Sequence, residues 1–305
     1  MKKQLTIFLV LFLMFAATAQ VQVTSGKVQR FENFKSKLID ARNIDVWLPD
    51  GYSEKEKYAV LYMHDGQALY DTQSTWNKQA WEIDELPGKL IAEGKAQKFI
   101  VVGIWNNGAK RHPEYFPQKP FENLTQIQRD TVTAQLQKAG RTKDIFKPYS
   151  DLYLQFLVTE VKPFIDKTFS TKKDQKNTFV AGSSMGGLIS MYAICEYPKV
   201  FGGAACLSTH WPGTFSSNNN PIPNAFVAYL KKKLPNPKDH KIYFDYGDQT
   251  LDAMYKPLQE KVDVVMKAKG FTNKNWETKF FPGENHSEVA WAKRLDIPLL
   301  FLLKN

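Results

Sequence analysis

Cysteine is scarce in this sequence, which contains two, Cys195 and Cys206, among 305 residues. A chain so poor in cysteine does not rest on a disulfide framework. With 17 glycines and 16 prolines the composition is not collagen-like or low-complexity, and 43% hydrophobic residues exclude a disordered chain. Beyond the first twenty residues, no apolar run is long enough to cross a membrane. Length and composition therefore predict a folded protein with a sizeable core.

Motifs for cofactors and metals are also missing. The sequence has no P-loop and no dinucleotide-binding fingerprint, and no second histidine lies at ligand spacing from His64 and Asp65. We therefore expect no cofactor and no metal site. Positive charge is in excess, because 41 Lys and Arg against 31 Asp and Glu give a net charge of +10. The lysines are spread along the chain without a nucleic-acid-binding motif, which favours a solvated surface; an acidic substrate or anionic polymer is the alternative.

The first nineteen residues have the pattern of a cleavable secretory signal peptide. Lys2 and Lys3 precede an apolar run over residues 5–15, and Ala17-Thr18-Ala19 forms a small-x-small cleavage site. We expect cleavage after Ala19 and a secreted or periplasmic mature chain with no membrane anchor. In an oxidising compartment the two cysteines could form a disulfide, but two buried free thiols are the favoured interpretation.

Strand-like and helix-like segments alternate from about residue 44 to the C-terminus. Nearly continuous apolar runs of strand length suit strands that are buried on both faces of a parallel sheet. The predicted strands are 44–48, 58–63, 99–104, 178–181, 203–207, 242–244 and 277–281. Between them, apolar residues recur at helical spacing over 153–165 and 262–266. The pattern predicts an α/β fold with a mainly parallel central sheet and helices on both faces, in a single domain over residues 20–305.

One long segment departs from this alternation. Residues 106–148 are rich in Pro, Gln, Lys and Thr and show no clear hydrophobic period. We expect an irregular insertion that covers part of a site, because long excursions from compact folds commonly carry function.

A candidate nucleophile, Ser184, lies in Gly182-Ser183-Ser184-Met185-Gly186, a G-x-S-x-G match. The pentapeptide follows a predicted strand and precedes helical sequence, which is the context in which a strained turn presents a nucleophilic serine. The turn also aims a helix N-terminus and the Met185 N–H at a developing oxyanion. A glycine-rich turn with an incidental serine is the alternative interpretation.

A serine hydroxyl needs a general base, and the sequence has five histidines. His286 lies in a loop between the last predicted strand and a final helix, where this fold class places its base, after the nucleophile and the acid in chain order. The acid is expected after the strand 242–244, where Asp248 and Asp252 compete. Asp252 is favoured, although either carboxylate could instead form a turn or cap a helix.

Further candidate site residues follow other predicted strands. After strand 58–63, Gly66 lets the backbone approach a ligand closely, and the N–H of Gln67 is the second candidate oxyanion donor, with the N–H of Gly66 as the alternative. Trp105 and Trp211 each follow a strand, at the edge where ligand sites form in such sheets. We expect these two indoles to bind substrate, with packing beneath loops as the alternative.

Four motifs together resemble the putative-esterase family. They are LYMHDGQALYD (61–71), VVGIWNNGAKRHPEYFP (101–117), AGSSMGGLISMYA (181–193) and Gly-x-x-His-Ser-Glu-x-x-Trp (283–291). This family belongs to the α/β-hydrolases and includes esterase D, enterochelin-esterase-like enzymes and feruloyl or acetyl-xylan esterases. The resemblance runs from about residue 43 to the C-terminus. It implies a Ser-Asp-His hydrolase with Ser184 as nucleophile, Asp252 as acid and His286 as base.

The function predicted from these residues is exported serine carboxylic-ester hydrolysis through an acyl-enzyme, without a cofactor. Expected substrates are small-molecule or glycan-linked esters, including esters of carbohydrates or siderophores. An acyltransferase with a sugar or lipid acceptor and a catalytically inert ligand-binding relative are the alternatives. The pattern indicates neither the natural ester nor the oligomeric state.

Overall fold

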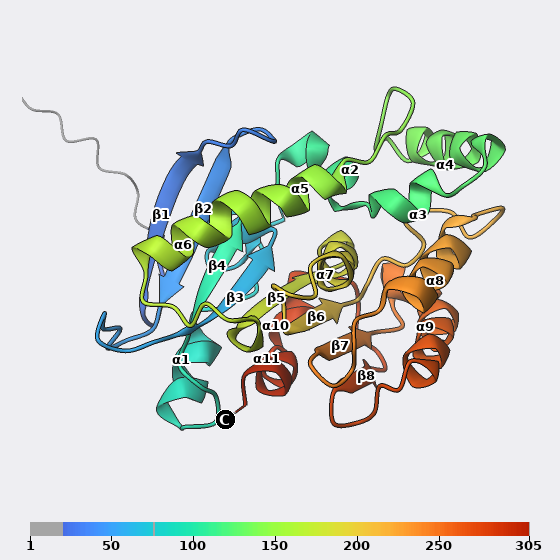
Figure 1. Ribbon diagram of the computed structural model, residues 1–305. Helices are drawn as coiled ribbons and strands as arrows, with labels where there is room; N and C mark the ends of the chain where they lie inside the picture. Colours follow the sequence, from blue (N-terminus) through green and yellow to red (C-terminus); the bar gives the residue numbers. More distant parts are fainter. Residues whose placement is uncertain (1–20, 76, 305) are drawn as a thin grey trace, which may run out of the picture.

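The computed structural model describes residues 21–75 and 77–304, so the predicted signal peptide, residues 1–19, lies outside the described residues. Its centre is an eight-stranded sheet in the order β1-β2-β4-β3-β5-β6-β7-β8 (Figure 1). The strands are β1 (Lys27–Phe34), β2 (Arg42–Leu48), β3 (Ala59–His64), β4 (Phe99–Ile104), β5 (Thr178–Ser183), β6 (Gly203–Leu207), β7 (Lys241–Tyr246) and β8 (Trp276–Phe280). β2 pairs antiparallel with β1 and β4, and all other neighbours pair parallel.

All seven predicted strands are present, and the prediction of a mainly parallel sheet is confirmed. The additional strand, β1, was not predicted because it lies at the sheet edge and only Val28 in it is buried. An edge strand with so little apolar surface gives no hydrophobic run to find.

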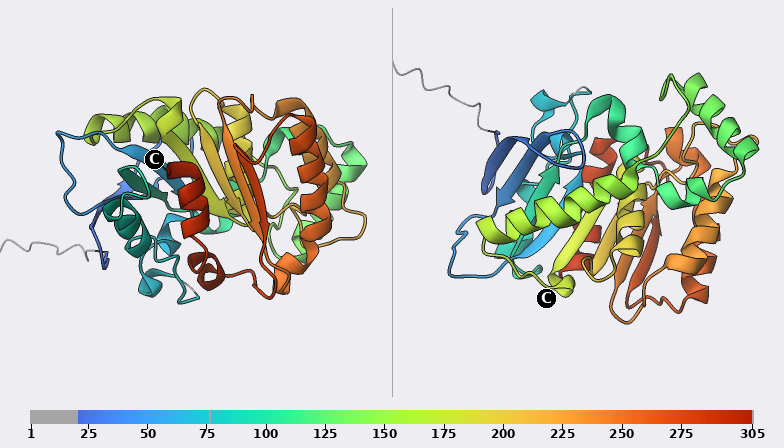
Figure 2. Two further views of the ribbon diagram at one scale, coloured as in Figure 1. Left: turned by 90° about the horizontal axis from the view of Figure 1, so that it is seen from below. Right: turned by 45° about the horizontal axis from the view of Figure 1, so that its top comes forward.

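Helices cover both faces of the sheet, as predicted (Figure 2). They are α1 (Glu85–Ala92), α2 (Arg111–Tyr115), α3 (Gln118–Glu122), α4 (Gln126–Lys138), α5 (Ser150–Phe156), α6 (Lys162–Thr168), α7 (Met185–Glu196), α8 (Ile222–Lys233), α9 (Lys256–Ala268), α10 (Glu288–Ala292) and α11 (Asp296–Leu303). A π-helical turn, Leu157–Val161, joins α5 to α6, so the predicted helix over 153–165 is continuous. In the described part of the chain, no helix combines the length and the apolar character that a membrane span requires.

Two hydrophobic cores lie on opposite faces of the sheet. Successive residues of a strand point to opposite faces, so that Val60 and Tyr62 of β3 enter one core and Leu61 and Met63 enter the other. Helices α5 to α9 cover the first core, whereas α1 and α11 cover the second. This double coverage explains why the central strands read as continuous apolar runs.

The two cysteines lie in the first core. Cys195 on α7 and Cys206 on β6 are buried and unbridged, so the favoured prediction of two free thiols is confirmed. Burial raises the pKa of both thiols, which keeps them protonated and unreactive.

The insertion at residues 106–148 was predicted to be irregular, but it contains the helices α2, α3 and α4. Helix α4 is capped at its N-terminus by the Thr125 side chain. It was missed because only Val132, Thr133 and Leu136 are buried in it. A helix that exposes most of its surface shows no strong apolar period.

A buried ion pair holds the insertion to the sheet. Arg42 at the start of β2 donates from Nη1 and Nη2 to the two carboxylate oxygens of Glu114 in α2, at 2.8 and 2.7 Å. Both side chains are almost fully buried, at 2% and 0% exposed. The guanidinium also lies over the rings of Tyr153 and Phe156 in α5. The pair therefore joins β2, the insertion and α5.

Replacing Glu114 by glutamine is expected to lower the free energy of unfolding by about 3 kcal/mol or more, because the buried charge of Arg42 then lacks its counter-charge. Chemical denaturation measures this loss. Glu56→Gln is the matched control, since the Lys98–Glu56 pair has both side chains more than 40% exposed and contributes little. An equal loss of unfolding free energy in the two variants would contradict the stabilising role of the buried Arg42–Glu114 pair.

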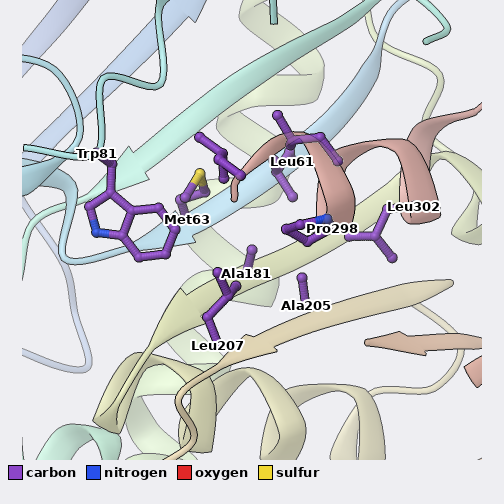
Figure 3. A pocket seen from close by; sticks show the side chains of 10 residues that line it. Leu61, Met63, Trp81, Ala181, Ala205, Leu207, Pro298 and Leu302 are labelled. Carbon is purple, nitrogen blue, oxygen red and sulfur yellow. The ribbon is translucent and has the colours of Figure 1, made fainter. Parts of the chain in front are cut away.

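A small apolar cavity of about 10 Å³ lies between the sheet and α11 (Figure 3). Its lining consists of Leu61, Met63, Trp81, Ala181, Ala205, Leu207, Leu295, Pro298, Leu299 and Leu302. All these side chains are apolar, and a void of this kind stays dry. It is a gap in the second core rather than a site for chemistry.

Candidate active site

Ser184 occupies a strained turn between β5 and α7. Its backbone angles are φ 57° and ψ −121°, in a region that a residue with a Cβ rarely adopts. Its N–H donates to the Leu207 carbonyl of β6 at 2.9 Å, which holds the turn against the neighbouring strand. A Cβ on Gly182 would lie 2.7 Å from the carbonyl carbon of Gly186, so the first glycine of the motif permits this close approach. The turn thus has the strand–turn–helix geometry that the motif predicts.

Asp252 and His286 are in direct contact. Nδ1 of His286 lies 2.6 Å from Oδ1 of Asp252, whose side chain is fully buried. Asp252 lies in a 3₁₀ turn after β7, and Oδ2 accepts the N–H of Gly247 at 2.7 Å. His286 lies in the loop between β8 and α10, and its ring packs edge-on against Trp291 at 4.9 Å. Both loops leave the same edge of the sheet as the Ser184 turn.

Asp248, the other candidate acid, plays a different part. Its Oδ1 accepts the backbone N–H of Gly283 at 2.8 Å and the side-chain amide of Gln249 at 2.8 Å. It therefore supports the turn that precedes His286 without contacting the imidazole. Of the two carboxylates that the sequence left open, Asp252 is the one that lies against His286.

Tyr255 was not recognised in the sequence as a site residue. Its hydroxyl lies 2.8 Å from Nδ1 of His210, and the Ser184 side chain contributes to its electrostatic environment. Burial raises the pKa of Tyr255 well above its ordinary value, so the hydroxyl stays protonated. Its ring packs edge-on against that of His286 at 5.8 Å. The sequence offered one signal for Tyr255 as a site residue: it lies three residues after Asp252, within one helical turn.

No hydrogen bond joins Ser184 to His286 within the described part of the chain. The side-chain hydrogen bond of the imidazole goes to Asp252. Contacts between nucleophile and base are commonly loose in free enzymes and tighten with substrate.

The two candidate oxyanion donors lie on adjacent segments. Met185 begins α7, whose N-terminus follows Ser184 directly. Gln67 lies in a 3₁₀ turn just after β3, and its side-chain oxygen accepts the N–H of Asn106 at 3.1 Å. A Cβ on Gly186 would lie 3.2 Å from the Asp65 carboxylate, so the start of α7 packs against the start of this turn.

An ion pair from the insertion anchors the Gln67 turn. Arg111 donates from Nε and Nη2 to the two oxygens of Asp65, each at 2.7 Å, and Asn106 adds a third bond at 2.7 Å. Burial alone would raise the pKa of the Asp65 carboxyl, but the charge and hydrogen bonds of Arg111 hold it below its ordinary value. Asp65 itself is left-handed, with φ 59°. Arg111 and Asn106 were not recognised from the sequence, because their partner is some 40 residues away.

The two predicted substrate-binding tryptophans are held by other residues. The indole N–H of Trp105 donates to the buried Asp45 at 2.8 Å, and Arg30 lies over its ring at 4.7 Å. Trp211 is only 2% exposed, and its N–H donates to Gln259. Trp211 is therefore a packing residue of the first core, as the alternative interpretation expected.

Three histidines near the site are buried: His64, His112 and His210. Burial is the largest cause that lowers their pKa values, to about 3 for His64 and His112 and well below the ordinary value for His210. All three are neutral at pH 7. In the unfolded chain they titrate near pH 6.5.

These histidines are expected to make the protein less stable in mild acid. Their contribution is complete above about pH 6.5, and it falls as the unfolded state takes up protons that the folded state does not bind until about pH 3. Between pH 7.5 and 5.5 the three together should lower the free energy of unfolding by about 4 kcal/mol. Denaturant titrations of wild type and His112→Leu at both pH values test this. Between the two pH values, the free energy of unfolding of His112→Leu should fall by about one third less than that of wild type. An identical fall in the two proteins would contradict the prediction.

Over residues 21–75 and 77–304, no group of three or more His, Cys, Asp or Glu side chains is arranged to hold a metal ion. Asp252 and His286 are instead joined to each other by a hydrogen bond, and Asp252 also accepts the Gly247 N–H. This arrangement is suited to nucleophilic chemistry by a serine.

Comparison with known proteins identifies a family that this chain matches. The family model described as putative esterase matches residues 36–301. An endo-1,4-beta-xylanase/feruloyl esterase of Xylanibacter ruminicola is 24% identical over 284 residues, which cover 90% of this chain but 31% of that protein. The chain thus spans about a third of the length of that relative. Carboxylesterase SOBER1 of Arabidopsis thaliana is 26% identical over 172 residues, which cover 56% of this chain and 68% of that protein.

Solved structures show the same fold. A ferulic acid esterase superposes with a TM-score of 0.62 at 20% identity, over 91% of this chain and 98% of that chain. The enterobactin esterase of Shigella flexneri superposes with a TM-score of 0.60 at 15% identity, over 93% of this chain and 60% of that chain. These likenesses confirm the predicted α/β-hydrolase fold. Because the family model covers most of the sequence, this chain belongs to the putative esterase family.

Proposed function

We propose that the chain is a serine carboxylic-ester hydrolase with Ser184, Asp252 and His286 as its catalytic triad. The observation that carries the proposal is the 2.6 Å contact between the fully buried Asp252 and His286. It lies at the edge of the sheet where the strained turn presents Ser184. The chain order of nucleophile, acid and base is that of the α/β-hydrolases.

In the proposed reaction, Asp252 accepts the Nδ1–H of His286 and leaves Nε2 as the base. Nε2 takes the Ser184 proton as Oγ attacks the ester carbonyl, and the resulting imidazolium protonates the departing alcohol. The acyl group then remains on Ser184. Water, deprotonated by His286, attacks this acyl-enzyme, so that the carboxylic acid leaves and the serine is restored.

The backbone N–H groups of Met185 and Gln67 are the proposed oxyanion donors. Met185 adds the positive end of the α7 dipole. The pair of Asp65 with Arg111 holds the Gln67 turn in place, because it ties the turn to the insertion by two bonds of 2.7 Å. A rigid donor pair stabilises developing charge without reorganising during the reaction.

The surroundings of Ser184 favour an ester with a planar acyl group. Beyond Tyr255, the rings of His210 and Phe215 lie 5.2 Å apart, and His112 lies 6.4 Å from the same Phe215. Neutral rings of this kind pack well against flat apolar groups. Relatives named as feruloyl and enterobactin esterases support esters of carbohydrates or siderophores as the substrate class.

From the pattern of residues 1–19 we further propose export to the periplasm or the exterior.

The test is hydrolysis of p-nitrophenyl acetate together with labelling by a serine-directed fluorophosphonate. The proposal expects turnover and a single covalent label on Ser184, with the label slowed by added ester. A chain that is neither labelled nor active would refute it. Release of p-nitrophenol only when an alcohol acceptor is added would identify an acyltransferase instead.

A further inference from the structure

The segment that leaves β6 contacts two members of the proposed triad. The Leu207 carbonyl accepts the N–H of Ser184 at 2.9 Å, and the His210 N–H donates to the Ser184 carbonyl at 3.1 Å. Between them in the chain, the hydroxyl of Ser208 donates to Oδ2 of Asp252 at 2.6 Å. Four consecutive residues thus set the nucleophile turn and the acid relative to each other.

The direction of the Ser208–Asp252 hydrogen bond follows from the other partners of the hydroxyl. Trp291 donates its indole N–H to Ser208 Oγ at 2.9 Å, and Arg294 donates from Nη2 at 3.2 Å. Indole and guanidinium nitrogens only donate. The two lone pairs of the hydroxyl are therefore occupied, and its one hydrogen points to Asp252.

Ser208 is held in this orientation by a buried ion pair. It is fully buried, with φ 40°, in the left-handed region that favours glycine. Its N–H donates to the carbonyl of Asp245 at 2.9 Å and to the Asp245 carboxylate at 3.1 Å. That carboxylate pairs with Arg294 at 3.0 Å, with both side chains buried. Glycine would be less strained than serine at this backbone conformation. The serine that is present, Ser208, has its hydroxyl held in a fixed position next to Asp252.

We propose that Ser208 is a positioning residue that orients the Asp252 carboxylate and thereby fixes the tautomer of His286. The inference rests on the proposed function. Oδ2 of Asp252 receives two donors, the hydroxyl of Ser208 and the N–H of Gly247. Only Oδ1 then faces Nδ1 of His286, which must carry the proton. Nε2 is left with its lone pair free to act as the base.

The experiment compares Ser208→Ala and Ser208→Gly with wild type in p-nitrophenyl acetate hydrolysis. Both variants lack the hydroxyl, and glycine suits the backbone at φ 40°, so Ser208→Gly remains informative if alanine impairs folding. Ser190→Ala is the matched control, because Ser190 is also fully buried but donates to the Gly186 carbonyl within α7, at 2.7 Å. Thermal unfolding of every variant reports its stability.

The expected result is a fall in kcat of about 10- to 100-fold in both Ser208 variants, with KM near that of wild type, because the catalytic groups lose their alignment. The acid limb of kcat/KM should also move to higher pH. Asp252 without this donor is more basic and holds the imidazolium of His286 more strongly. The other groups that face His286 are Tyr255 and His210, which burial keeps neutral, and Trp291.

Wild-type kcat and an unmoved acid limb in folded Ser208→Gly would overturn the inference. A loss equal to that of Ser190→Ala, or one that appears in KM alone, would also overturn it by showing a merely structural role. Fluorophosphonate labelling separates this failure from that of the proposed function. A labelled, active wild type with unaffected Ser208 variants refutes the positioning role alone, whereas an unlabelled, inactive wild type refutes both.

Discussion

Replacing Ser184 by alanine is expected to lower kcat for a short-chain p-nitrophenyl ester by roughly 10⁶-fold, because the acyl-enzyme can no longer form. Alanine keeps the Cβ and the backbone strain of the turn, at φ 57°. The turn is held by backbone bonds to Leu207 and His210 rather than by the side chain. The variant should therefore fold as wild type does. Initial rates, with circular dichroism and thermal unfolding as folding controls, measure the effect.

A second variant makes this prediction stricter. His286→Ala should cause a loss of similar size, and the double variant with Ser184→Ala should lose little more, since residues that act as one unit are not additive. Substantial ester hydrolysis by a folded Ser184→Ala protein would exclude the proposed nucleophile. Losses that multiply in the double variant would show that the two residues act independently.

Replacing Asp252 by asparagine is expected to lower kcat by roughly 10⁴-fold. Oδ2 of Asp252 receives the Ser208 hydroxyl and the Gly247 N–H. An asparagine must keep its carbonyl oxygen towards these two donors, which turns its NH₂ group to Nδ1 of His286. The imidazole then accepts at Nδ1 and carries its proton at Nε2, where it cannot deprotonate Ser184. Steady-state rates at several pH values test the prediction.

Asp248→Asn is the matched control for this variant. Asp248 lies four residues away and accepts the Gly283 N–H through Oδ1, a bond that an amide oxygen preserves. Its kcat should stay close to that of wild type. The assignment of the acid would be reversed if Asp248→Asn lost activity and Asp252→Asn retained it.

Most of the fold was predictable because its signals are local. Strands such as β3 and β5 are buried on both faces and read as short apolar runs, and α5 to α6 shows helical spacing. Two elements that were not predicted, β1 and helix α4 of the insertion, share one cause. β1 buries a single residue and α4 buries three, so their sequences carry little hydrophobic pattern.

The site divides in the same way. Ser184, Met185 and His286 could be predicted as candidates because a strand–turn–helix signature and the chain order mark them without knowledge of distant partners. The sequence favoured Asp252 over Asp248 but left both open as the candidate acid, since both follow β7. It depends on a contact between residues 34 positions apart.

The supporting residues lie further from any local signal. Ser208 meets Trp291 and Arg294 across 83 and 86 positions, and Arg111 meets Asp65 across 46. Local sequence indicates which backbone conformation a segment prefers and which reactive side chains it contains, because propensity and hydrophobic period act over a few residues. The pairing of a buried donor with one particular acceptor depends on how the strands stack and where their loops meet. For this reason the chain's own pattern was enough to predict a serine esterase, whereas the folded arrangement was needed to show that Asp252 contacts His286 and that Ser208 contacts Asp252.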